Sequence, residues 1–290
     1  MNYDTSMKVG FIGVGYMGYG IAKNLLKHGH DLHIIANKNR KPIEKIVSEG
    51  AIEAKNLNEL CKKNLDSLFL CVTNTPIAKT IAEELTKNLS YKTLIIDITT
   101  HSKDGSIEME KIFSKKKINY VECPVMGGPV QAENGILGGI VGGNNENFKK
   151  AEPYLKCFCK DYFHFGNIGA GAKSKLLNNF LSIGTATFVI EFIKCAKKLD
   201  VDLKKLFEVA KLGSGHSAAL IRIFDKVLQN DYTGFRFSTS NTHKDLSYIH
   251  EMLREMDNAH QLAEITKSFY KEAIDRGYGD LFISELIKKN

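Results

Sequence analysis

Features that would place this chain in a membrane or outside the cell are scarce in its 290 residues. No stretch approaches the roughly 18 uninterrupted apolar residues that a membrane helix requires, and the residues before Lys8 are polar, without an apolar signal core. The six cysteines form no CxxC pair and are too sparse for a disulfide scaffold. We therefore expect a soluble, cytoplasmic protein with no membrane partner, whose cysteines are reduced thiols in the core.

Arginine is also rare. The chain has 40 basic and 33 acidic residues, a net charge of +7, yet only five of the basic residues are arginine. Nucleic-acid-binding proteins usually gather positive charge in one stripe and grip phosphates with arginine, whereas here the lysines are scattered among acidic residues. Most of this charge is typical of a solvated surface. The excess suits a small anionic ligand better than nucleic acid, which we do not expect as a partner.

The composition that is present is that of a globular protein of about two domains, with 43% hydrophobic and 25% charged residues. Between Lys8 and Gly143, short apolar runs alternate with amphipathic stretches of helical length, which predicts parallel βαβ units. The predicted strands cover residues 9–12, 32–36, 67–72, 94–98, 119–121 and 139–141.

From Gly169 onward the pattern becomes helical. Apolar residues between Leu176 and Ile193 cover nearly every face of one long segment, which is typical of a helix buried at a domain or subunit interface. Closely spaced glycines precede this segment and mark a boundary. We predict an α/β fold, with a Rossmann-type doubly wound domain over residues 1–166 followed by an all-helical domain over residues 167–290.

A dinucleotide site is predicted at the first strand-to-helix turn. Gly13, Gly15 and Gly18 form a GxGxxG motif that directly follows the first predicted strand and precedes a helical pattern. The first glycine permits a tight turn, the second lets the backbone approach a pyrophosphate, and the third allows close helix–strand packing. The pyrophosphate would then lie on the helix N-terminus, near Tyr16 and Met17, where free N–H groups favour negative charge.

The end of the second predicted strand indicates which dinucleotide is bound. An NAD enzyme usually has an acidic residue there to bind the ribose hydroxyls, but this chain has Asn37, Lys38, Asn39 and Arg40. Two cations beside a neutral amide would attract a 2′-phosphate that a carboxylate would repel. The segment favours NADP over NAD, with ordinary loop cations as the alternative interpretation of Lys38 and Arg40.

A lysine and two amides lie near the start of the long helix. Asn178 and Asn179 stand at i+3 and i+4 from Lys175, so the three side chains lie on adjoining parts of one helix face. A desolvated amine can donate a proton to a carbonyl oxygen during reduction and recover it during alcohol oxidation, while the amides orient the amine and hold the substrate. The residues alone leave open a lysine that extends to solvent.

Several motifs, in order and over essentially the whole chain, resemble those of the β-hydroxyacid dehydrogenase family. They are the segment from Lys8 to Gly18, Asn37-Lys38, Asp97-Ile98-Thr99-Thr100, Pro124-Val125-Met126-Gly127-Gly128, Lys175 with Asn178 and Asn179, and His243-Lys244-Asp245-Leu246. The resemblance implies an NAD(P)-dependent oxidoreductase that interconverts a small β-hydroxyacid, similar to 3-hydroxyisobutyrate, and its semialdehyde or ketoacid by hydride transfer. We also expect a homo-oligomer, either a dimer or a tetramer, and no metal.

The resemblance also implies residue roles. Catalysis is implied for Lys175, Asn178 and Asn179. Cofactor contacts are implied for Gly13, Gly15, Tyr16, Met17, Gly18, Asn37, Lys38, Arg40, Val72, Thr73, Thr99, Thr100 and Lys244. Substrate contacts are implied for Thr100, Met126, Gly127, Gly128, Lys175 and Asn179. The site is expected in the cleft between the two domains.

The chain departs from the family pattern at a few positions. Met126 replaces a serine that donates a hydrogen bond to the substrate carboxylate, which reduces the expected donors to the amides of Gly127 and Gly128. The substrate is therefore expected to be less polar at this point or to bind differently. Lys103 stands where proline is frequent, and Thr99 replaces serine but keeps the hydroxyl.

Other functions are compatible with parts of this pattern. A glyoxylate or succinic semialdehyde reductase would use the same site. An imine reductase has a similar layout but usually lacks the lysine, and a non-catalytic nucleotide-binding scaffold is a role of relatives that have lost it. The presence of Lys175 argues against these last two alternatives.

Overall fold

The computed structural model describes residues 6–36 and 39–289, and these form two compact units that divide between Lys175 and Leu176. The units meet within one continuous helix, α8 (Ala170–Lys198), whereas the predicted boundary lies before that helix, between residues 166 and 167. The first turns of α8 belong to the first unit because they contact its strands, as described below. Each unit is described here by itself.

The first unit is built on a parallel six-stranded sheet. Its strands are β1 (Lys8–Ile12), β2 (Asp31–Ile35), β3 (Ile52–Ala54), β4 (Ser67–Leu70), β5 (Leu94–Asp97) and β6 (Asn119–Glu122). Their order is β3-β2-β1-β4-β5-β6, and every pair is parallel. This order confirms the predicted doubly wound domain. The strand order reverses direction between β1 and β4, the place where such sheets bind ligands at the carboxyl ends of their strands.

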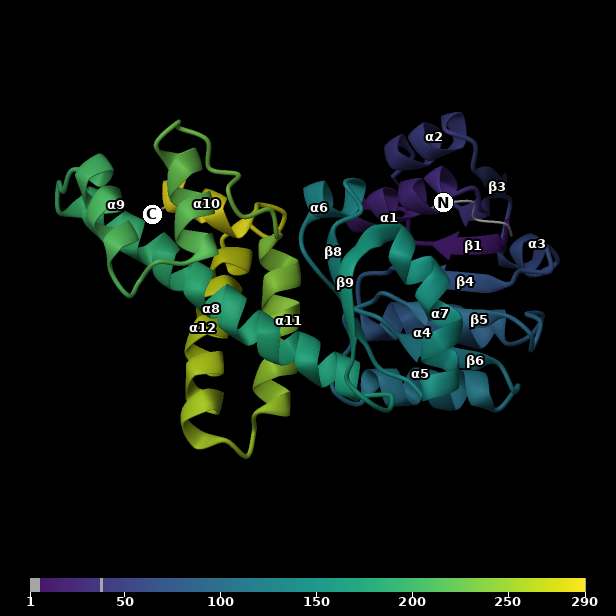
Figure 1. The fold of residues 1–290 in the computed structure, drawn as a ribbon. Helices are drawn as coiled ribbons and strands as arrows, with labels where there is room; N and C mark the ends of the chain where they lie inside the picture. Colours follow the sequence, from purple (N-terminus) through teal and green to yellow (C-terminus); the bar gives the residue numbers. More distant parts are fainter. Residues whose placement is uncertain (1–5, 37–38, 290) are drawn as a thin grey trace. The chain divides into compact units, whose positions relative to one another are not determined.

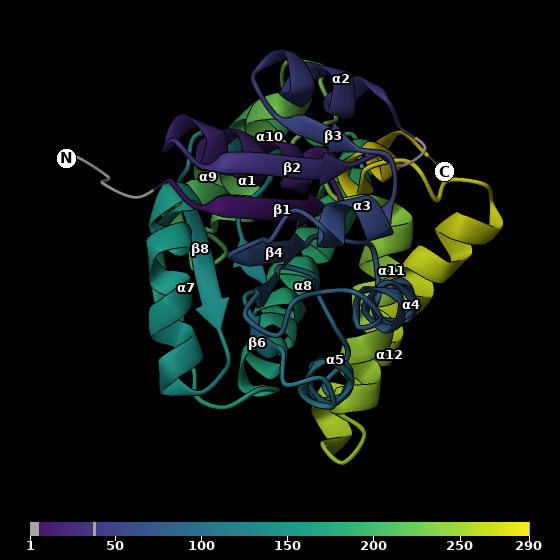
Figure 2. The same cartoon turned by 90° about the vertical axis from the view of Figure 1, so that its right-hand side faces the viewer.

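Helices cover both faces of this sheet. They are α1 (Tyr16–Lys27), α2 (Lys41–Ser48), α3 (Leu57–Cys61), α4 (Thr75–Leu85), α5 (Gly105–Ser114) and α7 (Asn145–Phe158). Leu25 of α1, Ile46 of α2 and Phe158 of α7 share one buried cluster with Phe11 of β1. Residues of α3, α4 and α5 form a second cluster on the opposite face. Figure 2 shows the strands between α7 on one side and α4 and α5 on the other.

A smaller sheet follows the main one in the chain. It contains β7 (Val125–Met126), β8 (Leu137–Val141) and β9 (Cys159–His164), and α6 (Pro129–Glu133) connects β7 to β8. The predicted strand at residues 139–141 is confirmed, but it does not extend the parallel six-stranded sheet, because β8 pairs antiparallel with β7 and parallel with β9 in a separate sheet. The turn before α6 therefore lies at one edge of this small sheet.

The second unit is entirely helical in the described residues, as predicted (Figure 1). It contains most of α8 and then α9 (Leu203–Leu212), α10 (Ala218–Val227), α11 (Thr239–Met252), α12 (Asp257–Asp275) and the 3-10 helix η1 (Ile283–Lys288). Its core combines Leu176 and Ile193 of α8 with Phe224, Ile249 and Tyr270 from the helices that follow.

The long helix α8 is apolar on two faces that differ in burial. Leu176, Ile183 and Ile193 are buried in the core, whereas Leu181 and Phe188 are exposed by 70% and 76%. By length and composition alone α8 could cross a membrane, with 39% of its most apolar window buried in the structure. The core helix of a soluble protein passes the same test, and α8 supplies the core of the second unit.

All six cysteines are free thiols. Four of them are buried, and Cys71 is partly buried with a thiol whose pKa burial raises to about 12. Cys195 is exposed, so the expectation of a core thiol is wrong at this position. It lies on α8, where the apolar residues around it in the sequence do not all face the core.

Candidate active site

The three glycines of the GxGxxG motif differ in whether the surrounding structure leaves room for a side chain. Gly13 has a φ of +105°, and a Cβ there would lie 2.1 Å from the carbonyl oxygen of Cys71. A Cβ at Gly18 would lie 2.0 Å from the carbonyl oxygen of Gly13. These two positions require glycine for the turn and for close packing of α1, as predicted.

Gly15 differs, because a Cβ there would meet nothing within 4 Å and its φ is −102°. The fold itself therefore does not demand glycine at this position. Gly15 is the N-cap of α1, and no side chain caps the helix, which begins at the exposed Tyr16 and the partly buried Met17. Open space beside uncapped helix N–H groups fits the pyrophosphate of a dinucleotide, because these groups and the helix dipole favour an anion.

The ends of β4 and β5 are tied together beside this turn. The backbone N–H of Val72 donates to Thr99 Oγ1 at 3.2 Å, and the backbone N–H of Thr99 donates to Asp97 Oδ1 at 2.9 Å. Thr73 is exposed and Thr100 is partly buried in the same two loops. Four predicted cofactor-site residues thus follow two neighbouring strands at the carboxyl edge of the sheet.

A buried polar network that the sequence reasoning missed supports this edge. Asp97 Oδ2 lies 2.9 Å from His101 Nε2 and accepts a 3.1 Å hydrogen bond from Tyr120 OH, and His101 Nδ1 lies 3.1 Å from Thr75 Oγ1. Burial raises the pKa of Tyr120 well above its usual range, so its hydroxyl remains a donor to Asp97. The Asp-x-x-Thr spacing gave the one sequence signal here, because Tyr120 of β6 and Thr75 of α4 come from other elements, although His101 lies only four residues after Asp97.

The segment predicted to select NADP is described only in part. Asn37 and Lys38 lie outside the described residues. Arg40 is half-exposed and forms a bidentate pair with Glu53 of β3, with distances of 2.7 and 3.0 Å to its two carboxylate oxygens. This hydrogen bond lowers the pKa of Glu53. A 2′-phosphate would therefore compete with the Glu53 carboxylate for Arg40.

The predicted substrate loop runs from β7 into α6. Met126 ends β7, Gly127 has a φ of +118°, and Gly128 is the N-cap of α6. The backbone N–H of Gly128 donates to Gln131 Oε1 at 3.0 Å. A substrate that uses this amide as a donor must displace the Gln131 side chain, which the sequence reasoning did not anticipate.

Lys175 is buried, with 8% of its surface exposed. Its Nζ donates to the carbonyl oxygen of Val125 at 2.8 Å and lies 3.3 Å from Met126 Sδ. The alternative of a lysine that extends to solvent is therefore wrong. The amine is held directly beside the predicted substrate loop, where a bound carbonyl group would meet a proton donor.

The remaining predicted site residues belong to the second unit. Asn178 is partly buried, and Asn179 is buried with its Nδ2 donating to Asp245 Oδ2 at 2.7 Å. Lys244 Nζ lies 2.9 Å from Asp245 Oδ1, so Asp245 joins the amide of α8 to the lysine of α11. Sequence reasoning did not assign a role to Asp245, although this residue lies within the Lys244-Asp245-Leu246 segment that resembles the family motif.

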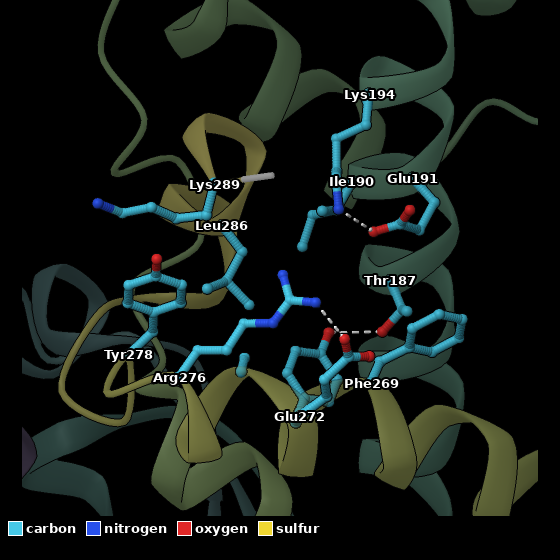
Figure 3. Close-up of a pocket in the computed structure, with 12 residues that line it drawn as sticks. Thr187, Ile190, Glu191, Lys194, Phe269, Glu272, Arg276, Tyr278, Leu286 and Lys289 are labelled. Carbon is cyan, nitrogen blue, oxygen red and sulfur yellow. Dashed lines mark hydrogen bonds and ion pairs between the residues drawn. The ribbon is translucent and has the colours of Figure 1, made fainter. Parts of the chain in front are cut away.

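A pocket of about 230 Å³ in the second unit contains none of the predicted site residues (Figure 3). Lys194 contacts Glu191 at 3.1 Å, Arg276 pairs with Glu272, and Lys289 lies over the Tyr278 ring. The Thr187 and Tyr270 hydroxyls are hydrogen bonded at 2.5 Å. Nothing among these contacts indicates a ligand.

Comparison with known proteins decides the family. Residues 8–166 match the model of the NAD-binding domain of 6-phosphogluconate dehydrogenase. Residues 169–289 match the model described as NAD-binding of NADP-dependent 3-hydroxyisobutyrate dehydrogenase. The chain belongs to the β-hydroxyacid dehydrogenase family. It is an NAD(P)-dependent oxidoreductase that acts on a hydroxyl group.

Individual relatives agree with this assignment. The chain is 29% identical over 289 residues to 2-(hydroxymethyl)glutarate dehydrogenase of Eubacterium barkeri, with 98% of this chain and 95% of the relative covered. It is 28% identical over 293 residues to mitochondrial 3-hydroxyisobutyrate dehydrogenase of Drosophila melanogaster, with 97% and 89% covered. A solved 3-hydroxyisobutyrate dehydrogenase from Salmonella typhimurium has the same fold, with a TM-score of 0.88, 22% identity and coverage of 98% and 99%.

Proposed function

We propose that this enzyme uses NADP(H) to interconvert a small β-hydroxyacid and its semialdehyde or ketoacid, with Lys175 as the general acid and base. The observation that carries the proposal is the buried Lys175 amine, whose Nζ lies 2.8 Å from the Val125 carbonyl oxygen beside the loop at Met126. A buried amine is costly unless it is held by acceptors. Its fixed place at this loop suits proton transfer to a bound carbonyl.

The two hydrogen equivalents of the reaction have separate sources. The nicotinamide, when bound, supplies or accepts the hydride at carbon. In the direction of reduction, Lys175 gives a proton to the carbonyl oxygen and becomes the neutral amine. In the direction of oxidation, it takes the hydroxyl proton and becomes the ammonium. The Val125 carbonyl oxygen and the Met126 sulfur hold the amine in place in both directions of the reaction.

Met126 supports a substrate with less hydrogen-bonding capacity near the lysine. Its thioether lies 3.3 Å from Lys175 Nζ and is a weak acceptor without a donor. With the Gly128 amide already bound to Gln131, few donors remain in this loop for a substrate carboxylate. The carboxylate of a preferred substrate is therefore expected to lie away from Met126.

The preference for NADP rests on the cations after β2. The ion pair with Glu53 holds the Arg40 guanidinium at the carboxyl edge of the sheet. The Glu53 carboxylate therefore competes with a 2′-phosphate for this guanidinium. The neutral Asn37 and the basic Lys38 precede it in the sequence. Residues 169–289 match a family model described for an NADP-dependent 3-hydroxyisobutyrate dehydrogenase, which also supports this preference.

We also propose a cytoplasmic homo-oligomer, a dimer or tetramer. Leu177, Leu181, Phe188 and Phe192 are exposed on α8 at spacings that share one helix face. Contiguous exposed apolar side chains favour a protein interface. The six free thiols suit a reducing compartment such as the cytoplasm.

Initial rates test the proposed function. The purified protein would be assayed with a panel of β-hydroxyacids and semialdehydes, with glyoxylate, and with a cyclic imine, each with NADPH or NADP and with NADH or NAD. We expect the highest kcat/KM for a semialdehyde or its β-hydroxyacid with the phosphorylated cofactor. A higher kcat/KM for the imine would favour imine reduction, and activity with none of the compounds would favour a scaffold.

A further inference from the structure

Glu122 is a buried carboxylate at the end of β6, and its hydrogen-bond donors include three backbone N–H groups at the start of α8. Its side chain is 0% exposed. Oε1 accepts hydrogen bonds from the backbone N–H groups of Gly169 at 2.7 Å and Gly171 at 2.9 Å, and Oε2 accepts from that of Ala172 at 3.2 Å. These N–H groups have no partner within the helix, because they belong to its first turn.

Glycines make room for this carboxylate. A Cβ at Gly142 would lie 2.1 Å from Glu122 Oε1, and a Cβ at Gly171 would lie 3.0 Å from the same atom. Gly169 has a φ of +92°, which turns its N–H toward the carboxylate at a backbone conformation that favours glycine. Gly169 and Gly171, at the start of α8, are thus explained by the carboxylate that they surround, in addition to marking a boundary in the sequence.

Electrostatics also favours this placement. Burial raises the pKa of Glu122, whereas the Ser106 side chain and the hydrogen bonds from Gly169, Gly171 and Ala172 oppose that increase. A negative charge at the N-terminus of a helix is further stabilised by the helix dipole. The carboxylate therefore holds the first turn of α8 with both charge and hydrogen bonds.

The same short segment also holds Lys175. Glu122 accepts hydrogen bonds from N–H groups at the start of α8, including that of Ala172. Lys175 lies three residues after Ala172, about one turn further along the helix. Three residues after Glu122, the Val125 carbonyl oxygen accepts a hydrogen bond from Lys175 Nζ. Both the backbone of the lysine's helix and its amine are therefore fixed against the segment that leads into the loop at Met126.

We propose that Glu122 is a positioning residue, which fixes the first turn of α8 so that the Lys175 amine lies beside the substrate loop. The inference rests on the proposed proton-transfer role of Lys175. Because a misplacement of about 1 Å can cost about 10²-fold in rate, a small movement of this turn is expected to reduce kcat strongly. Cofactor binding at Gly13 to Gly18 depends on other elements and is expected to change little.

The test uses Glu122→Asp and Glu122→Gln in the full-length protein, with Glu110→Gln as the matched control on an exposed carboxylate of α5. The aspartate is one methylene shorter and withdraws the carboxylate by about 1.5 Å. The glutamine keeps the length but presents an N–H₂ group to at least one backbone N–H. We expect kcat to fall tenfold or more in both variants. The NADPH Kd and the kcat of the control are expected to remain within threefold of wild type.

A double-mutant cycle separates positioning from a general structural effect. In the Lys175→Ala background, Glu122→Gln is expected to reduce kcat less than twofold further, because no amine remains to be misplaced. An equal tenfold loss in both backgrounds would overturn the inference, as would wild-type kcat in folded Glu122 variants. Failure of both variants to fold would also overturn it, because Glu122 would then be required for the fold itself.

The same cycle distinguishes the two hypotheses. If Lys175→Ala retains wild-type kcat, the proposed proton-transfer role is wrong. If Lys175→Ala loses activity while Glu122→Asp does not, the role of Lys175 stands and only the positioning role of Glu122 is wrong.

Discussion

Single residues in the glycine motif have separable functions. Gly13 is constrained by its positive φ and by the Cys71 carbonyl oxygen, whereas Gly15 faces space that no protein atom occupies within 4 Å. The GxGxxG motif already predicted a turn role for Gly13 and a ligand-approach role for Gly15. The structure adds the physical basis, because a Cβ would meet backbone atoms at Gly13 and nothing within 4 Å at Gly15.

We predict opposite outcomes for alanine at these two positions. Gly15→Ala is expected to keep the wild-type free energy of unfolding but to raise the NADPH Kd at least tenfold, because its methyl group occupies the space of the pyrophosphate. Gly13→Ala is expected to destabilise the protein by more than about 1 kcal/mol, because alanine is strained at positive φ. Thermal unfolding and fluorescence titration with NADPH measure both effects. Wild-type cofactor affinity in Gly15→Ala would contradict this account of the site.

Arg40 and Glu53 provide a second test at the residue scale. If Arg40 binds the 2′-phosphate, Arg40→Gln is expected to raise the NADPH Kd by roughly tenfold or more, because a charged hydrogen bond to the phosphate is lost, and to leave the NADH Kd nearly unchanged. Glu53→Gln is expected to lower the NADPH Kd, because it releases Arg40 and removes a repelling carboxylate. A wild-type enzyme that binds NADH more tightly than NADPH would contradict the preference.

At the scale of elements, strands were predictable where the sequence carried a strong apolar signal. β1, β4 and β5 are continuous runs of mostly buried apolar residues, and each lies within a few residues of its prediction. β3 has three residues with only one buried, and β7 has two residues, so neither has a period to detect. β9 carries two exposed charged residues and forms through its pairing with β8, a tertiary interaction that local pattern does not report.

The apolar face of α8 was also predicted, and its exposed side chains lead to a test of assembly. We expect the wild-type protein to be a dimer or tetramer by light scattering coupled to gel filtration. Leu181→Glu combined with Phe188→Glu is expected to yield monomers, because a charge at a buried interface is costly unless it is paired. Leu212→Glu is the control, since this α9 side chain is 89% exposed but lies on another helix. A monomeric wild-type protein would contradict the proposed assembly.

At the scale of the whole molecule, the sequence pattern predicted the fold class, and the motifs singled out Lys175 as the proposed catalytic residue, but neither indicated which groups hold its amine. The Val125 carbonyl and the Glu122 carboxylate lie about fifty residues before their partners in the chain, with separations of 50 for Lys175 and 47 for Gly169. Local spacing contains no signal for contacts over such separations. The sequence pattern singled out the loop at Val125 and the glycines before the long helix. Only the fold brings Lys175 to that loop and Glu122 to Gly169.

The most direct test of the account is the kcat of Lys175→Ala. Lys173→Ala is the matched control, because Lys173 is exposed on the same turn of α8. We predict that Lys175→Ala lowers kcat by about 10² to 10⁴-fold on the best substrate, with an NADPH Kd within threefold of wild type, and that Lys173→Ala retains wild-type kcat. Near wild-type kcat in folded Lys175→Ala would contradict the proposed proton transfer.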